Sequence, residues 1–206
     1  QNASFSFADF CAGATNGPTG IVTPGGTFSF NPNPGGGVTI NPSTGVISGG
    51  VGGATYTVQY TTPGPCPGIQ SESVMVLPLQ DATFTFADFC AGASNGPTGI
   101  VTPGGTFSFN PNPGGGVTIN PSTGVITGGM AGATYTVQYT TPGPCPGTQT
   151  ESVSVLPNVT PTLTSQGPFC TNDGPTPLPT TQSGIIGNWS GPGVVSNQFN
   201  PSGLTP

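Results

Sequence analysis

The first 158 residues consist of two nearly identical copies of one segment. Residues 1–79 and 80–158 are identical at 68 of 79 positions, and a third, diverged copy follows, marked by its own Phe169-Cys170 pair. A repeat of this length predicts a series of small structural units. We therefore predict domains at 1–79, 80–158 and 159–206, the last an incomplete copy that lacks its final strands.

Apolar side chains alternate with Ser, Thr or Gln in three places within one repeat, which is the pattern of a half-buried strand. These places are Phe5 with Phe7, Phe28 with Phe30, and the run Tyr56, Val58 and Tyr60. Shorter runs at 20–22, 38–40, 45–47 and 74–77 bring the number to about seven strands, with Gly/Pro turns between them.

No stretch shows an apolar stripe at helical spacing. The fold class that we predict is all-β, with tandem immunoglobulin-like antiparallel β-sandwiches arranged end to end as a rod. A β-helix is the competing all-β interpretation, but one coil of a β-helix is far shorter than the repeat seen here. The stiff junction at residues 76–82 predicts a fixed tilt between successive domains.

The chain has no Lys, Arg or His, and its only ionised side chains are six Asp and Glu, giving a net charge of −6. This composition excludes a basic nucleic-acid footprint and a polybasic membrane patch. No apolar run reaches the roughly 18 residues of a membrane span, and no signal peptide is recognisable. We expect an interior or mature fragment that has no nucleic-acid partner and no membrane span.

Cysteine spacing is the same in both copies. Cys11 and Cys66 are as far apart in the sequence as Cys90 and Cys145, while Cys170 has no partner within its shortened copy. We predict disulfides within copies, Cys11–Cys66 and Cys90–Cys145, and hence an oxidising compartment. Free thiols or a zinc site are the alternatives, but two thiols without His fall short of four zinc ligands.

Four ordered motifs of the second copy resemble the immunoglobulin-like repeats of large cell-surface adhesins and gliding-motility-associated proteins of Bacteroidota-type bacteria. They are Phe89-Cys90-Ala91-Gly92, residues 102–107, residues 119–126 and residues 133–139, closed by Cys145. The third copy resembles a sister repeat through residues 167–170, 178–181, 187–189 and Asn200-Pro201-Ser202-Gly203. The resemblance implies export and an adhesive or filament-forming role, although the absence of Lys and Arg departs from it.

Candidate chemistry is sparse. The carboxylate pairs Asp9 with Glu72 and Asp88 with Glu151 could form a glycosidase dyad, but a small sandwich offers no large cleft. Calcium at Asp81 in the junction would need six to eight oxygen ligands, and no Asp-rich loop supplies them. We predict no enzyme activity, no catalytic residue, no metal site and no cofactor.

The function that we predict is the structural shaft of a bacterial cell-surface adhesin or extracellular filament. The alternative is a multivalent carbohydrate-binding module that acts by avidity. The expected partners are copies of the same repeats, in fibres or in a longer chain, and a surface glycan. Alternating aromatics are typical of a core, so we expect them there, and we expect Trp189 to fill the core of the third copy from its central strand. The third domain is completed either by chain beyond residue 206 or by a strand from another subunit.

Overall fold

The computed structural model describes residues 1–202 and Leu204, and the chain divides into two compact units, Gln1–Pro157 and Asn158–Pro206. Gly203 of the predicted motif and the predicted end of the third domain at Pro206 lie outside the described residues. No helix occurs among the described residues.

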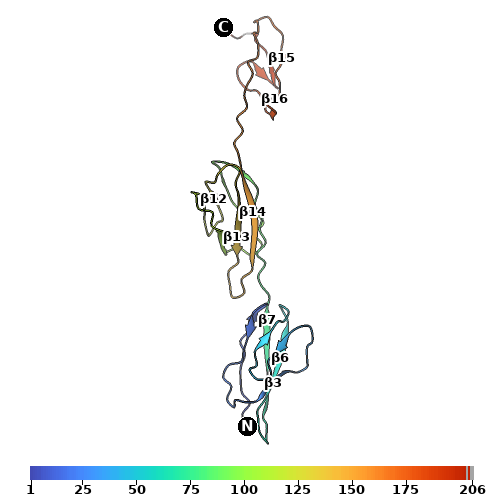
Figure 1. Cartoon of the computed structure of the whole chain (residues 1–206). Coiled ribbons are helices and arrows are strands. Elements are labelled where there is room, and N and C mark those ends of the chain that lie inside the picture. Colours follow the sequence, from blue (N-terminus) through green and yellow to red (C-terminus); the bar gives the residue numbers. More distant parts are fainter. Residues whose placement is uncertain (203, 205–206) are drawn as a thin grey trace. The chain divides into compact units, whose positions relative to one another are not determined.

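The first repeat contains seven strands in two sheets (Figure 1). The four-stranded sheet has the order β1-β7-β6-β3 and the three-stranded sheet has the order β2-β5-β4. The strands are β1 (Phe10–Cys11), β2 (Thr15–Asn16), β3 (Thr27–Phe30), β4 (Thr39–Ile40), β5 (Ile47–Ser48), β6 (Thr55–Thr61) and β7 (Ile69–Leu77).

The second repeat has the same arrangement, with sheets β10-β13-β14-β8 and β11-β12-β9. Its strands are β8 (Phe89–Cys90), β9 (Ser94–Asn95), β10 (Thr106–Phe109), β11 (Thr118–Ile119), β12 (Ile126–Thr127), β13 (Thr134–Thr140) and β14 (Thr148–Leu156). Two sheets of four and three strands are the layers of an immunoglobulin-like sandwich. The prediction of tandem all-β, immunoglobulin-like sandwiches is confirmed.

Each repeat encloses a hydrophobic core of its own. In the first repeat the core forms around Phe5, Phe28 and Tyr60, whose rings pack against one another, and in the second around Phe84, Phe107 and Tyr139. Val58 and Val74 at the sheet centre are fully buried. The alternating aromatics therefore fill the cores, as their spacing indicates. The domain boundaries after residues 79 and 158 stay predictions.

Two details of the strand prediction are wrong. The runs at Phe5–Phe7 and 20–22 do not form strands. An isolated bridge joins Ser6 to Thr19, and Val22 N–H donates to Ser4 O (3.1 Å). Gly20, at φ +64°, lies between these two contacts, so the backbone there departs from the extended conformation of a strand. The sheet is also not wholly antiparallel, because β1 pairs with β7, and β8 with β14, in parallel.

The second unit consists of five two-residue strands. They are β15 (Thr176–Pro177), β16 (Thr181–Gln182), β17 (Ile185–Ile186), β18 (Val194–Val195) and β19 (Gln198–Phe199), in sheets β15-β19-β18 and β16-β17. Leu178 and Pro201 are its buried apolar side chains among the described residues. That this unit is an incomplete sandwich stays a prediction.

Candidate functional site: the junction between the two repeats

A stiff loop between β13 and β14 carries Cys145. Its ends are hydrogen-bonded to each other: Thr141 N–H donates to Gly147 O (3.0 Å), and Gly147 N–H donates to Thr141 Oγ1 (2.7 Å). Three prolines lie between these ends and fix the backbone φ angles. Gln80 N–H, at the start of the second repeat, donates to Cys145 O (3.0 Å). The loop therefore holds Cys145 at the end of the second repeat where the chain arrives from the first.

Cys11 lies at the end of the first repeat from which the chain leaves. Strand β1 pairs with the last residues of β7, with Cys11 opposite Leu77, and Ala12 N–H donates to Leu77 O (2.9 Å). Leu77 and Gln80 are close in the sequence, separated by about 10 Å of extended chain. The topology thus brings Cys11 and the Cys145 loop to the same short junction.

A disulfide joins Cys11 to Cys145, with the two Cα atoms 5.3 Å apart across a sequence separation of 134 residues. It connects the two repeats rather than closing either one. Cys145 is only 3% exposed at this junction. Cys66, Cys90 and Cys170 are exposed free thiols.

This bond corrects the predicted pairs Cys11–Cys66 and Cys90–Cys145. Cys11 lies beside Leu77 at one end of β7, whereas Cys66 precedes Ile69 at the other end. Eight strand intervals separate these ends by about 26 Å, but a disulfide needs Cα atoms within roughly 7 Å. The two cysteines of one repeat therefore cannot meet while β7 is formed. The same geometry in β14 keeps Cys90 away from Cys145.

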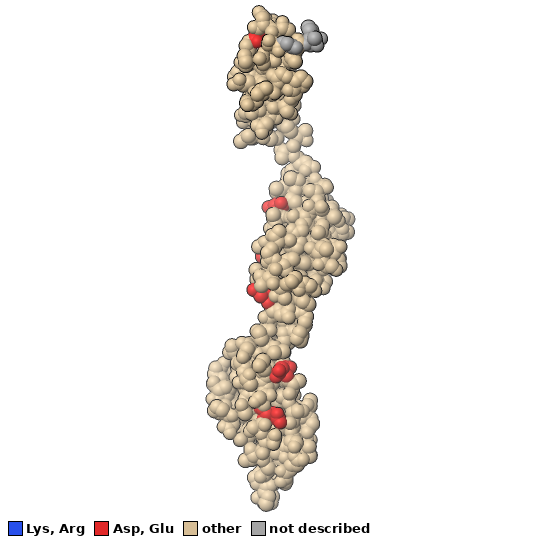
Figure 2. Space-filling model, turned by 180° about the vertical axis from the view of Figure 1, so that it is seen from behind, with Lys and Arg blue, Asp and Glu red and all other residues tan. Residues whose placement is uncertain are grey.

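The predicted carboxylate pairs serve as local structural groups. Asp9 Oδ1 accepts a hydrogen bond from Met75 N–H (2.8 Å), and Asp88 Oδ1 accepts one from Ser154 N–H (2.8 Å). These bonds satisfy backbone groups of β7 and β14 next to the two-residue strands β1 and β8. Glu72 has a different partner, the Gln70 side chain. On the face seen in Figure 2 the carboxylates form separate patches on an otherwise uncharged surface.

Asp81 holds a turn at the start of the second repeat. Hydrogen bonds from the Thr83 hydroxyl and then from Thr83 N–H lower the pKa of its carboxyl below the ordinary value. Asn2 forms the same turn in the first repeat by accepting from Ser4. Because a neutral amide serves equally well there, the turn does not depend on a cation. Among the described residues, no three Asp, Glu, Cys or His side chains cluster as metal ligands would.

A hollow of about 370 Å³ lies beside β3 and β4, and a hollow of about 360 Å³ lies at the equivalent place in the second repeat. Phe30, Asn33 and Thr39 are among the residues that line the first. The polar groups there are uncharged, so the hollow offers no acid or base for catalysis.

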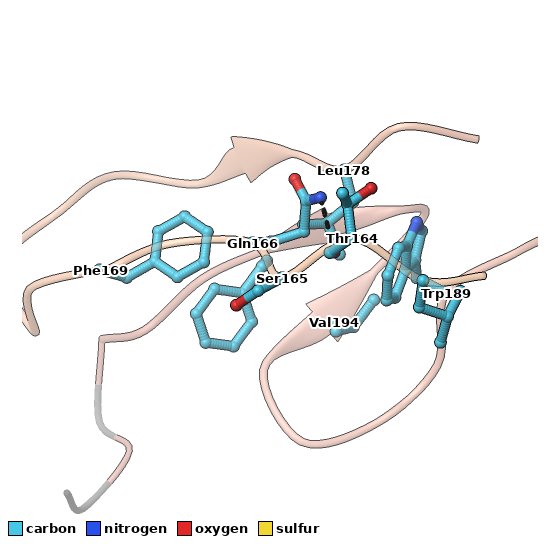
Figure 3. Close-up of a pocket in the computed structure, with 9 residues that line it drawn as sticks. Thr164, Ser165, Gln166, Phe169, Leu178, Trp189 and Val194 are labelled. Atoms are coloured by element: carbon cyan, nitrogen blue, oxygen red, sulfur yellow. Dashed lines mark hydrogen bonds between the residues drawn. The ribbon is translucent and has the colours of Figure 1, made fainter. Parts of the chain in front are cut away.

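A hollow of about 540 Å³ lies in the second unit (Figure 3). Its apolar lining includes Leu178, Val194 and the rings of Phe169 and Trp189. Trp189 is half-buried in the loop between β17 and β18, and its Nε1–H donates to Pro179 O (2.8 Å). The expectation that Trp189 fills a core from a central strand is therefore wrong.

The chain matches no protein-family model, and no curated protein is detectably similar to it in sequence. Many solved structures are similar in part, and three of them serve as examples. Mouse cadherin-23 EC22–24 is 19% identical, with 77% of this chain and 64% of that chain covered and a TM-score of 0.29. Murine CEACAM1b is 9% identical, with 75% and 100% covered and a TM-score of 0.31.

The third is the insect immune protein hemolin, which is 16% identical, with 77% of this chain and 46% of that chain covered and a TM-score of 0.31. The chain thus spans less than two thirds of the cadherin-23 and hemolin structures. At these TM-scores nothing about the function of this chain follows from the similarities. No helix among the described residues is long and apolar enough to cross a bilayer.

Proposed function

We propose that this chain is a load-bearing segment of the shaft of a bacterial cell-surface adhesin or extracellular filament. The observation that carries the proposal is the disulfide between Cys11 and Cys145. A bond inside one domain would only stabilise that domain, whereas this bond spans the junction between two. The junction is therefore crossed by two covalent connections, the polypeptide chain and the disulfide, and we call the disulfide the clip.

The clip changes the path that a pulling force takes through the protein. Tension applied to the two ends passes from Cys11 through the disulfide to Cys145, so the residues between them carry no load. Their separation of 134 positions corresponds to about 45 nm of extended chain that cannot be drawn out while the bond is intact. Most of both sandwiches lies within this protected stretch.

The chemistry of the surface fits an extracellular structural element. A disulfide of this kind persists in oxidising compartments. The absence of Lys and Arg also leaves no cleavage site for trypsin-type proteases. Self-association through uncharged Ser- and Thr-rich strand faces is the proposed mode of lateral contact.

Single-molecule pulling of the full chain between terminal tags tests the proposal. We expect the fully unfolded wild-type chain to be shorter by about 45 nm than the same chain after reduction. A Cys11→Ser and Cys145→Ser double variant should reach the longer length without reductant, and Cys170→Ser should behave as wild type. Equal contour lengths for the oxidised and reduced wild-type chain would refute the clip. Immunogold label confined to the cytoplasm of source cells would refute the extracellular role.

The alternative function, multivalent glycan binding, is supported by one observation, the duplicated hollow beside Phe30 and Phe109. Two equivalent weak sites on one chain would bind by avidity. A glycan array would detect such binding. A Phe30→Ala and Phe109→Ala variant should lose it if the hollows are the sites.

A further inference from the structure

Cys90 has the same surroundings in the second repeat as Cys11 has in the first. Cys90 lies opposite Leu156 as Cys11 lies opposite Leu77, and Ala91 N–H donates to Leu156 O (2.9 Å) as Ala12 N–H donates to Leu77 O. The difference is the sulfur: Cys11 is bonded, whereas Cys90 is an exposed free thiol.

Cys66 likewise has the same local structure in the first repeat as Cys145 has in the second. Its loop closes through Thr62 N–H donating to Gly68 O (2.9 Å) and Gly68 N–H donating to Thr62 Oγ1 (2.7 Å), which reproduces the loop that holds Cys145. All residues from 53 to 68 are identical to their counterparts in the second repeat. Cys66 is nevertheless exposed and free, while Cys145 is bonded and buried.

The first repeat thus has a free cysteine in its loop, Cys66, and the second repeat has a free cysteine in a strand, Cys90. One bonded pair with the same two local structures already exists in this chain. We propose that Cys90 and Cys66 are the complementary halves of a second bond of the same kind, formed between Cys90 of one copy of the chain and Cys66 of a second copy. The inference deepens the proposed structural role and rests on it, because it extends the clip from one junction to a series.

The bond forms by two thiol–disulfide exchanges with a low-molecular-weight disulfide as oxidant. The thiolate of Cys90 attacks one sulfur of the oxidant, which gives a mixed disulfide and releases one small thiolate. The thiolate of Cys66 from the second copy then attacks the Cys90 sulfur and displaces the second small thiolate. The protein loses two protons and two electrons, and the oxidant gains them as two small thiols.

The pairing is heterologous, and this sets it apart from casual thiol oxidation. Each chain carries one Cys66 and one Cys90. Further chains can therefore add head to tail at both of these cysteines. A chain that lacks either half can accept one neighbour only. Cys170, which belongs to the second unit, takes no part.

The test incubates the full chain in a buffer of oxidised and reduced glutathione, blocks remaining thiols with N-ethylmaleimide, and separates the products on non-reducing gels. We expect wild type and Cys170→Ser to give a ladder of covalent oligomers. Cys66→Ser and Cys90→Ser should each remain monomeric, and an equimolar mixture of these two variants should give dimers and nothing larger. Circular dichroism melts of all variants check that each is folded.

Pepsin is suited to mapping the bond, because the chain has no Lys or Arg and the low pH stops further exchange. A linked peptide pair containing Cys66 and Cys90 is the expected product. No ladder from folded wild type, linked pairs of like cysteines, or a ladder that depends on Cys170 would each overturn the inference. Such results would leave the Cys11–Cys145 clip and its pulling test unaffected, so the two proposals fail separately.

Discussion

Asp81 shows how one charged side chain can be structural without being essential. Its carboxylate closes the turn at the start of the second repeat by accepting hydrogen bonds from Thr83, and Asn2 closes the same turn in the first repeat. The lowered pKa of Asp81 means that the folded state favours the charged carboxylate. The stabilisation is therefore present above the ordinary carboxyl pKa and is lost as the pH falls through the lowered folded value.

The Asp81→Asn variant should remove this part of the pH dependence. The amide keeps the acceptor oxygen but does not titrate, so its melting temperature should change less than that of wild type as the pH falls from 5 to 2. Thermal melts of both proteins across this range measure the difference. In Thr83→Ala, an NMR titration should find the pKa of Asp81 raised towards its ordinary value, since the hydroxyl donor is gone. An unchanged pKa in that variant would contradict the assigned cause.

At the scale of strands and loops, the disulfide couples the two repeats of the first unit. Cross-linking a loop of about this length stabilises the folded state by about 5 kcal/mol on the chain-entropy model. All four tyrosines lie in the first unit, and the single tryptophan, Trp189, lies in the second. Optical signals from the two residue types therefore report the two units separately.

The Cys11→Ser variant should lower the unfolding midpoint followed by tyrosine absorbance and leave the midpoint followed by tryptophan fluorescence unchanged. Denaturant titrations of the full chain measure both. Reduction of wild type should reproduce the effect, and Cys170→Ser should alter neither midpoint. A tyrosine midpoint that does not respond to reduction would show that the bond does not stabilise the first unit.

The long strands were predictable from the sequence because alternation of apolar and hydroxyl side chains is a local signal. This holds for β3, β6 and the end of β7. The two-residue strands β1 and β2 carry no such period, and the parallel pairing of β1 with β7 depends on contacts between distant parts of the repeat, such as Phe10 opposite Val76. Alternation of side chains therefore predicted the long strands of the sandwich, but not the two-residue strands β1 and β2.

The disulfide could not be assigned from spacing, because the repeat makes two pairings equivalent. A partner for Cys11 exists in its own copy, at Cys66, and again at the equivalent position of the next copy, Cys145. The choice is decided by the direction of β7, which carries the chain from the Cys66 loop to the end of the repeat where Cys11 lies. Strand direction is a property of the folded topology, and nothing in the cysteine spacing encodes it.

At the scale of the whole molecule, the lack of Lys, Arg and His governs the response to acid. Most proteins accumulate positive charge at low pH, and its self-repulsion helps to unfold them. This chain has a net charge of −6 at pH 7 and no side chain that can become positive, so acid only removes charge. The remaining cost of acidification is the weakening of carboxylate hydrogen bonds such as those that Asp81 accepts from Thr83.

We therefore expect the folded state to persist at pH 2, with a melting temperature lowered by on the order of 10 °C or less for each sandwich. Solubility should fall over the same range, because a protein near zero net charge loses the repulsion that keeps copies apart. Circular dichroism melts and light scattering at pH 7 and pH 2 measure the two effects, and 1 M NaCl at pH 7 serves as the control. Salt should leave the melting temperature nearly unchanged, since a chain without basic side chains has no side-chain ion pairs to screen. Loss of the β-sheet signal at pH 2 before any rise in scattering would show that the carboxylates hold the sandwiches together more strongly than their few hydrogen bonds account for.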